Sequence, residues 1–252
     1  MPLRTILANA LLSLALLWGG AAHAQDSMSE MLSRERLGVI EPGTYLASDT
    51  VGFAIESEGA NFLLRFQGAP EVFVLYADRA SMGGRILKYD SGETAIQVTV
   101  WGGITLYTDA KPNGLPAVRN GDAQPFALPA VSMNDMQNAA SDESQRLAYI
   151  RRLRLGISTD WNAIAGNSGL RAIYYDAMEN AARGIERFTA AGPARDALSK
   201  RVDTVSITPA AKPTVNVAGK TLLVTFNPGS GYVGRASSRA IARGLSKLFA
   251  VH

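Results

Sequence analysis

The residues best suited to chemistry form a glycine-rich string near the C-terminus. Asn227-Pro-Gly-Ser-Gly-Tyr-Val-Gly-Arg235 contains the spacing Gly-x-Gly-x-x-Gly, follows a predicted strand and precedes a predicted helix. That is the sequence context of a dinucleotide-binding fingerprint. Only 18 residues follow Gly234, too few for the second strand and the ribose-binding acid that such a unit requires. We therefore reject a dinucleotide site and expect no cofactor.

The same string has the features of a small-anion site. A glycine-rich loop that enters a helix presents unpaired backbone N–H groups and the positive end of the helix dipole. The candidate anion-binding residues are Gly229, Ser230, Gly231, Gly234, Arg235, Ser237, Ser238 and Arg239. The alternative is that the glycines only form a tight turn and that a serine only caps the helix. Both interpretations stay open at this point.

The predicted terminal helix is basic and amphipathic. Arg235, Arg239, Arg243 and Lys247 recur every four residues, opposite an apolar face that includes Ile241. Such a helix can lie on an anionic membrane surface, which makes a peripheral membrane contact one interpretation. The commoner arrangement packs the apolar face on a sheet and leaves the arginines facing water.

Carboxylates offer a second kind of chemistry. Five acidic residues lie in or beside predicted strands: Glu71, Asp78, Asp90, Glu93 and Asp109. A glycosidase needs only two carboxyl groups at a suitable separation. A histidine-free, carboxylate-dependent hydrolase of envelope polymers is therefore the alternative to a binding protein.

The composition excludes several classes of enzyme. The chain of 252 residues has no cysteine and two histidines, His23 and His252. We expect His23 to leave with the signal peptide described next, so that the mature chain keeps one histidine, at its last residue. A Ser-His-Asp or Cys-His triad needs an internal histidine, and zinc and haem sites need histidine or cysteine ligands. We expect no metal site, and the balance favours a protein that is not an enzyme.

The N-terminus predicts export. Arg4 supplies a positive charge, Ile6 to Trp18 is mostly apolar, and Ala22-His23-Ala24 places small residues at a cleavage site. The apolar run is too short to span a bilayer. We expect a signal peptide over residues 1–24, cleavage after Ala24, and a mature protein in the periplasm or secreted from the cell.

Charge is divided between the two halves of the expected mature chain. Residues 25–133 hold 8 Lys and Arg against 13 Asp and Glu, whereas residues 134–252 hold 16 against 9. Halves of opposite charge can dock on each other, or the basic half can meet an anionic partner. The partners we consider are a small anion, an envelope component or another protein, and we expect no nucleic acid.

The pattern of elements predicts an α+β protein. Short runs rich in Val, Ile, Phe and Tyr, separated by tight turns, predict strands over 44–47, 51–57, 61–67, 71–77, 85–89, 95–100 and 104–108. Connections this short allow only antiparallel pairing, so these strands should form a meander that closes as a sandwich or a barrel-like roll. A short helical arm is expected over 25–37, and Lys111 to Pro129 has the prolines and glycine of a linker or of a loop that wraps the sheet.

Helices and a small returning sheet are expected in the second half. Helices are predicted over 135–155 and 169–190, with a short helix capped by Ser158 or Thr159 between them. Strands are predicted over 202–208, 214–217 and 220–226, before a C-terminal helix over 236–250. We divide the chain into a signal peptide (1–24), an antiparallel β unit (25–130) and a helical and β lobe (131–252), which can form one continuous domain.

Three segments resemble an uncharacterised family of exported alphaproteobacterial proteins classed as a domain of unknown function. They are Leu63 to Leu75, Trp101 to Ala117 and Gly231 to Arg243, and this chain has Ala236 where the family pattern has proline. The resemblance implies an exported single unit and no functional residues. Together with the residues above, it leads us to expect a non-catalytic binding or envelope-interaction module.

Overall fold

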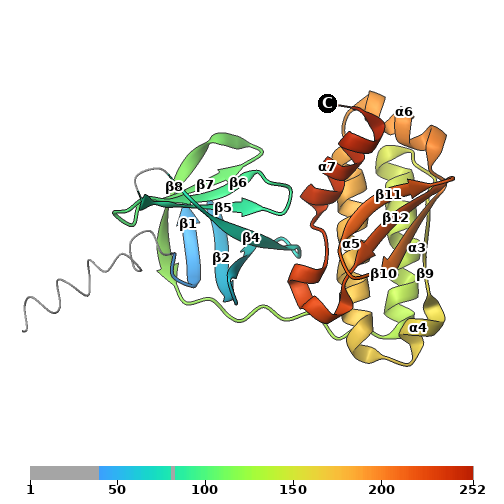
Figure 1. Ribbon diagram of the computed structural model, residues 1–252, viewed down its shortest axis with the longest axis horizontal. Coiled ribbons are helices and arrows are strands. Elements are labelled where there is room, and N and C mark those ends of the chain that lie inside the picture. The colour runs from blue at the N-terminus through green and yellow to red at the C-terminus, as the bar shows by residue number, and fades with distance from the viewer. Residues whose placement is uncertain (1–39, 81–82, 252) are drawn as a thin grey trace, which may run out of the picture.

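The computed structural model describes residues 40–80 and 83–251, which fold into a β-barrel and a helical lobe joined by an extended segment (Figure 1). The predicted signal peptide, the predicted arm over 25–37 and both histidines lie outside these residues. No helix within the described part of the chain has both the length and the apolar character needed to cross a membrane.

Eight antiparallel strands make the barrel. They are β1 (Gly43–Ala47), β2 (Val51–Glu58), β3 (Asn61–Phe66), β4 (Val72–Arg79), β5 (Arg85–Tyr89), β6 (Thr94–Val98), β7 (Ile104–Thr108) and β8 (Lys111–Gly121). Each strand pairs with the next, and β8 pairs with β1 to close the sheet. The predicted antiparallel meander is therefore confirmed, and it closes as a barrel.

The barrel interior is an apolar core. Side chains alternate between the two faces of a strand, so every second residue points inward. Phe73 lies in this core, with its ring centroid 5.2 Å from that of Tyr89 and 6.2 Å from that of Phe66. The filled interior leaves the polar chemistry of the barrel at its ends and on its outer face.

The prediction of a linker or loop over 111–129 is wrong for the first part of this segment, which forms β8. This strand contains Pro112, Pro116 and an Asn-Gly pair that are typical of loops. Gly114 has a φ of +85°, and a Cβ there would lie 2.5 Å from Thr105, so glycine allows the strand to bend against β7. From residue 122 onward the chain does run as an extended connection to the lobe.

A four-stranded sheet covered by helices forms the lobe. Its elements are α3 (Met133–Arg151), β9 (Gly156–Thr159), α4 (Trp161–Ala165), α5 (Ser168–Phe188), α6 (Gly192–Arg201), β10 (Thr204–Pro209), β11 (Thr214–Ala218), β12 (Thr221–Phe226), η2 (Pro228–Gly234) and α7 (Ser238–Phe249). The strand order is β11-β12-β10-β9, with β9, β10 and β12 parallel and β11 antiparallel. The α+β class with a returning sheet and a C-terminal helix is confirmed.

Two elements of the lobe differ from the prediction. Ser158 and Thr159 belong to β9, an edge strand, and Asp160 caps α4 instead. Helix α6 was not predicted because its apolar periodicity is weak, although Pro193 stands at its start and Lys200 and Arg201 at its end.

Close packing of α5 and α7 positions the functional end of the lobe. Gly184 of α5 faces Ile241 of α7, and a Cβ at Gly184 would lie 2.5 Å from the Cγ2 atom of Ile241. This approach fixes the N-terminal turn of α7 beside the side of α5 that carries Arg183 and Arg187.

One contact between barrel and lobe is apolar. Leu63 and Val74 point outward from the barrel and pack with Phe126 of the connection and Tyr232 of η2. The backbone N–H of Phe126 also donates a hydrogen bond to the Glu56 carboxylate at 2.7 Å. The connection is therefore bound to the barrel wall, as expected for a loop that wraps a sheet.

Candidate functional site at the junction of barrel and lobe

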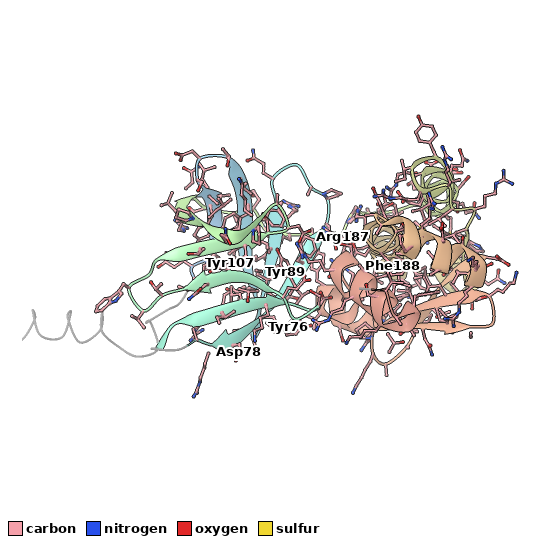
Figure 2. All side chains as sticks on the ribbon, turned by 90° about the horizontal axis from the view of Figure 1, so that it is seen from above. Tyr76, Asp78, Tyr89, Tyr107, Arg187 and Phe188 are labelled. Atoms are coloured by element: carbon pink, nitrogen blue, oxygen red, sulfur yellow. The ribbon has the colours of Figure 1, made fainter. Side chains whose placement is uncertain are left out.

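Four acidic residues lie at the end of the barrel that faces the lobe. Glu71 precedes β4, Asp90 and Glu93 lie in the β5–β6 turn, and Asp109 lies in the β7–β8 turn. Alternate connections of an antiparallel sheet emerge at the same end, which brings these three segments together. Figure 2 shows Tyr76 and Tyr89 in this region, beside the helix that carries Arg187 and Phe188.

The fifth acidic candidate does not join this group. Asp78 lies near the other end of β4 and pairs with Lys88 at 2.7 Å. The structure therefore brings together four of the five carboxylates that the sequence singles out, and it places them against the lobe.

The N-terminus of α7 binds two of these carboxylates. The backbone N–H and hydroxyl of Ser237 donate to Asp90 at 2.7 and 2.5 Å. The backbone N–H and hydroxyl of Ser238 donate to Glu71 at 2.8 and 2.7 Å. Helix N-termini favour negative charge, and here the barrel supplies that charge.

The buried position of Asp90 disfavours the ionised form of its carboxyl group. Burial raises the pKa of the Asp90 carboxyl, and the hydrogen bonds from Ser237 and the charge of Arg235 oppose this rise. Burial is the largest of these effects because a charged carboxylate loses its hydration inside a protein.

The predicted glycines form a tight turn before α7. Gly231 has a φ of +51°, and a Cβ at Gly234 would lie 2.1 Å from the carbonyl oxygen of Asn227. The N–H of Gly229 donates to the Asn227 side chain, and the N–H of Ser230 donates to the Asn227 carbonyl. These contacts agree with the alternative in which the glycines make a tight turn. An external anion at this loop stays a prediction.

Arg235 is buried between barrel and lobe, so the expectation that the arginines of this segment face water is wrong for it. Its side chain has no exposed surface, forms an ion pair with Asp176 of α5 and donates to the carbonyl of Val72 at 2.6 Å. Burial lowers the pKa of the Arg235 guanidinium to about 10, and the charges of Glu71 and Asp90 oppose this change. The residue still carries its proton at neutral pH.

Arg239 is the second arginine that is not free in water. Its guanidinium is 2.6 Å from both Glu93 and Asp109 and lies 4.4 Å from the centre of the Tyr89 ring. Arg187 of α5 binds the other oxygen of Asp109 at 2.8 Å. Asp109 therefore joins α5 and α7 to the barrel.

The ion pairs of Asp109 predict a specific pH dependence. Partial burial alone would raise the pKa of this carboxyl, but the charge of Arg239 and the hydrogen bonds from Arg239 and Arg187 lower it below 3.8. Ionised Asp109 thus stabilises the fold above that pH, and the contribution is lost as the pH falls through the lowered pKa. Exposed pairs contribute modestly, so Asp109→Asn should cost about 1 kcal/mol or less at pH 7.

Urea denaturation of both chains at several pH values measures this effect. The difference in unfolding free energy should be constant above roughly pH 5 and should shrink as the pH falls through the lowered pKa of Asp109. A difference that does not change with pH would contradict the assignment.

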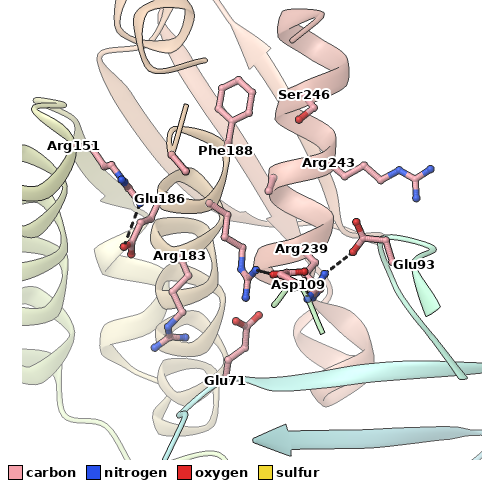
Figure 3. Close-up of a pocket in the computed structure, with 13 residues that line it drawn as sticks. Glu71, Glu93, Asp109, Arg151, Arg183, Glu186, Phe188, Arg239, Arg243 and Ser246 are labelled. Carbon is pink, nitrogen blue, oxygen red and sulfur yellow. Dashed lines mark hydrogen bonds and ion pairs between the residues drawn. The ribbon is translucent and has the colours of Figure 1, made fainter. Parts of the chain in front are cut away.

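A cavity of about 780 Å³ lies between these pairs (Figure 3). Its charged lining residues are Glu71, Glu93, Asp109, Arg151, Arg183, Glu186, Arg187, Arg239 and Arg243. Most of these groups are paired: Arg183 with Glu179, Arg151 with Glu186, and Arg187 and Arg239 with Asp109. Arg243 is exposed and forms no ion pair or side-chain hydrogen bond with any described residue.

The sequence indicated part of this lining. Arg239 was a candidate anion-binding residue, and Arg243 belongs to the predicted basic stripe. The sequence analysis did not identify Arg187. Its position one turn after Arg183, beside the apolar stripe of α5, is the signal that could have identified it. Within residues 40–80 and 83–251, no three His, Cys, Asp or Glu side chains gather as metal ligands would.

The chain belongs to the DUF4908 family, described as a domain of unknown function, whose model matches residues 24–245. The match spans both the barrel and the lobe. No curated protein and no solved structure matches the chain. The resemblance to a family of unknown function is confirmed at that level, and the exported, alphaproteobacterial character implied by it stays a prediction.

Proposed function

We propose that this protein is an exported, non-catalytic binding protein of the cell envelope that holds a small multivalent anion between its barrel and its lobe. The observation that carries the proposal is the cavity with five arginines in its lining. Arginine presents a planar fork of donors that matches phosphate and carboxylate groups, which makes an anion the natural ligand.

Arg243 gives the cavity a cation available to a ligand. The four lining carboxylates are engaged: Glu71 by Ser238, Glu93 and Asp109 by Arg239, and Glu186 by Arg146 and Arg151. The Nε atom of Arg151 has no hydrogen-bond partner among the described residues. Five arginines against four carboxylates leave the lining with one positive charge in excess.

The alternative of a carboxylate-dependent hydrolase is less well supported. A pair of catalytic carboxyl groups must face a shared space in which a substrate bond and a water can lie. Asp90 instead binds Ser237, and Asp109 is held by two arginines. These contacts use the carboxylates to attach the lobe, so we favour binding over hydrolysis.

Export rests on the N-terminal residues alone. The positive charge of Arg4, the apolar run from Ile6 to Trp18 and the small residues before Gln25 support a cleaved signal peptide. A protein with this signal meets envelope anions such as phosphate, lipid head groups, muropeptides and anionic oligosaccharides.

A thermal-shift screen of the chain against inorganic phosphate, pyrophosphate, glycerol phosphate and a muropeptide tests the proposal. A ligand at about a hundred times its Kd stabilises by roughly 2.7 kcal/mol, which corresponds to a rise in Tm of about 5–10 °C for a chain of this size. Pyrophosphate should give a larger shift than phosphate because it can bind two guanidinium groups.

Arg243→Gln should reduce the pyrophosphate shift strongly, because it removes the unpaired cation of the cavity. We expect a loss of affinity of at least ten-fold, as for one charge-assisted hydrogen bond of about 1.5–3 kcal/mol. Lys247→Gln is the matched control, since Lys247 lies one turn further along α7 and does not line the cavity. Equal shifts in the two variants, or a flat screen, would contradict the proposal.

A further inference from the structure

The end of the barrel that lies away from the lobe carries an unusual side chain. Trp101 is 90% exposed, in the turn that joins β6 to β7. Two hydrogen bonds close the turn: the N–H of Gly102 donates to the carbonyl of Thr99 at 3.0 Å, and the N–H of Gly103 donates to the hydroxyl of Thr99 at 2.9 Å. A fixed turn therefore presents a large indole to water, although indoles are usually at least partly buried.

Two arginines lie beside this turn. Arg79 and Arg85 stand directly opposite each other on β4 and β5, and Arg85 is in turn paired with Val98 at the end of β6. A Cβ at Gly83, just before β5, would lie 3.2 Å from Val100, so Gly83 lies against the β6–β7 turn. Arg79, Arg85, Val100 and Trp101 together define what we name the distal tip.

The charge of the distal tip is not neutralised within the described residues. Neither Arg79 nor Arg85 forms an ion pair with a described residue, and the nearby Asp78 carboxylate is taken by Lys88. Like charges directly opposite each other on neighbouring strands destabilise a sheet. A pair of unpartnered arginines beside an exposed indole fits a surface that is both anionic and partly apolar.

We propose that the distal tip docks on the surface of an anionic phospholipid bilayer. Tryptophan is enriched at membrane interfaces because its ring is apolar and its N–H is polar, and arginine binds lipid phosphates as a fork. The tip consists of the facing ends of β4 and β5 and of the β6–β7 turn, whereas a stable protein interface needs about 800 Å² from each partner. A bilayer surface can accept such a small projecting tip.

Docking in this way leaves the cavity facing away from the lipid. Strand β4 starts at Val72, which contacts Arg235 at the junction, and ends at Arg79 in the tip. Eight residues of strand at about 3.3 Å each place the two ends roughly 25 Å apart. The lobe and its anion cavity would therefore project from the membrane, open to soluble ligands.

The intrinsic fluorescence of Trp101 tests the proposal. In a chain carrying Trp18→Phe and Trp161→Phe, Trp101 is the one remaining tryptophan. On addition of phosphatidylglycerol vesicles, its emission should move to shorter wavelength and become quenched by brominated lipid, whereas phosphatidylcholine vesicles should cause neither change. This measurement reports on the tip itself, whether or not the N-terminal residues of the chain associate with lipid.

Charge removal provides the matched comparison. Arg79→Gln with Arg85→Gln should raise the vesicle concentration needed for half of the emission change by about five-fold for each arginine removed. Lys200→Gln with Lys212→Gln removes the same charge from exposed positions of the lobe and should leave the titration unchanged. Unchanged Trp101 emission with anionic vesicles, or equal titrations for the two double variants, would overturn the proposal.

Discussion

Arg235→Met should lower the free energy of unfolding by about 3–5 kcal/mol, because it leaves a charge without its partner inside the protein. The guanidinium is fully buried, and the side chain of its partner Asp176 is only 12% exposed. Without Arg235, the Asp176 carboxylate would therefore be poorly hydrated. The substitution also removes the donor to the carbonyl of Val72. Urea denaturation followed by circular dichroism measures the loss. Arg243→Met, at an exposed position of α7, should change stability by less than about 0.5 kcal/mol.

A second substitution separates the ion pair from simple packing. Asp176→Leu added to Arg235→Met removes the stranded carboxylate and replaces the pair by apolar groups, an exchange that is often neutral or stabilising. The double variant should therefore be more stable than Arg235→Met alone, which is a coupling that a double-mutant cycle detects. Additive losses would show that the two side chains do not act as a pair.

Removing the carboxylates at the N-terminus of α7 should have the next largest effect. Glu71→Ala with Asp90→Ala leaves the N–H and hydroxyl groups of Ser237 and Ser238 without acceptors in a buried position. An unsatisfied buried donor costs about 1–3 kcal/mol, so each carboxylate removed should cost about that much.

Hydrogen exchange locates this effect in the structure. The Ser237 and Ser238 amides should exchange slowly in the unaltered chain and much faster in the double variant. Glu58→Ala with Asp142→Ala is the matched control, because it removes two exposed acidic side chains and changes the net charge equally. Equal protection of the two amides in both variants would refute the role of Glu71 and Asp90.

Seven of the eight barrel strands were predictable because their apolar residues alternate and their turns are tight. β8 was not, because Pro112 and Pro116 suggest a loop when read alone. In the barrel it has a partner on each side, β1 and β7, and a register shift next to Leu106 accommodates the bend. Proline and glycine are tolerated at such irregular positions, which local sequence does not reveal.

The donors and the acceptors of the site were both among the candidates from the sequence, but their pairing was not predictable. Ser237, Ser238 and Arg239 do bind negative groups, as the physics of a helix N-terminus indicates. The carboxylates that they bind come from far away in the chain: Glu71 is 167 residues from Ser238. The opposite net charges of the two halves indicated that barrel and lobe could dock on each other, but they do not identify which residues pair.

The central claim is that carboxylates of the barrel bind the first turn of α7 and thereby join barrel and lobe into one unit. Differential scanning calorimetry of the full chain at pH 7 tests it most directly. We predict a single transition whose calorimetric and van't Hoff enthalpies agree, and its separation into two transitions in the chain with Glu71→Ala and Asp90→Ala. Two separate transitions in the unaltered chain would contradict the claim.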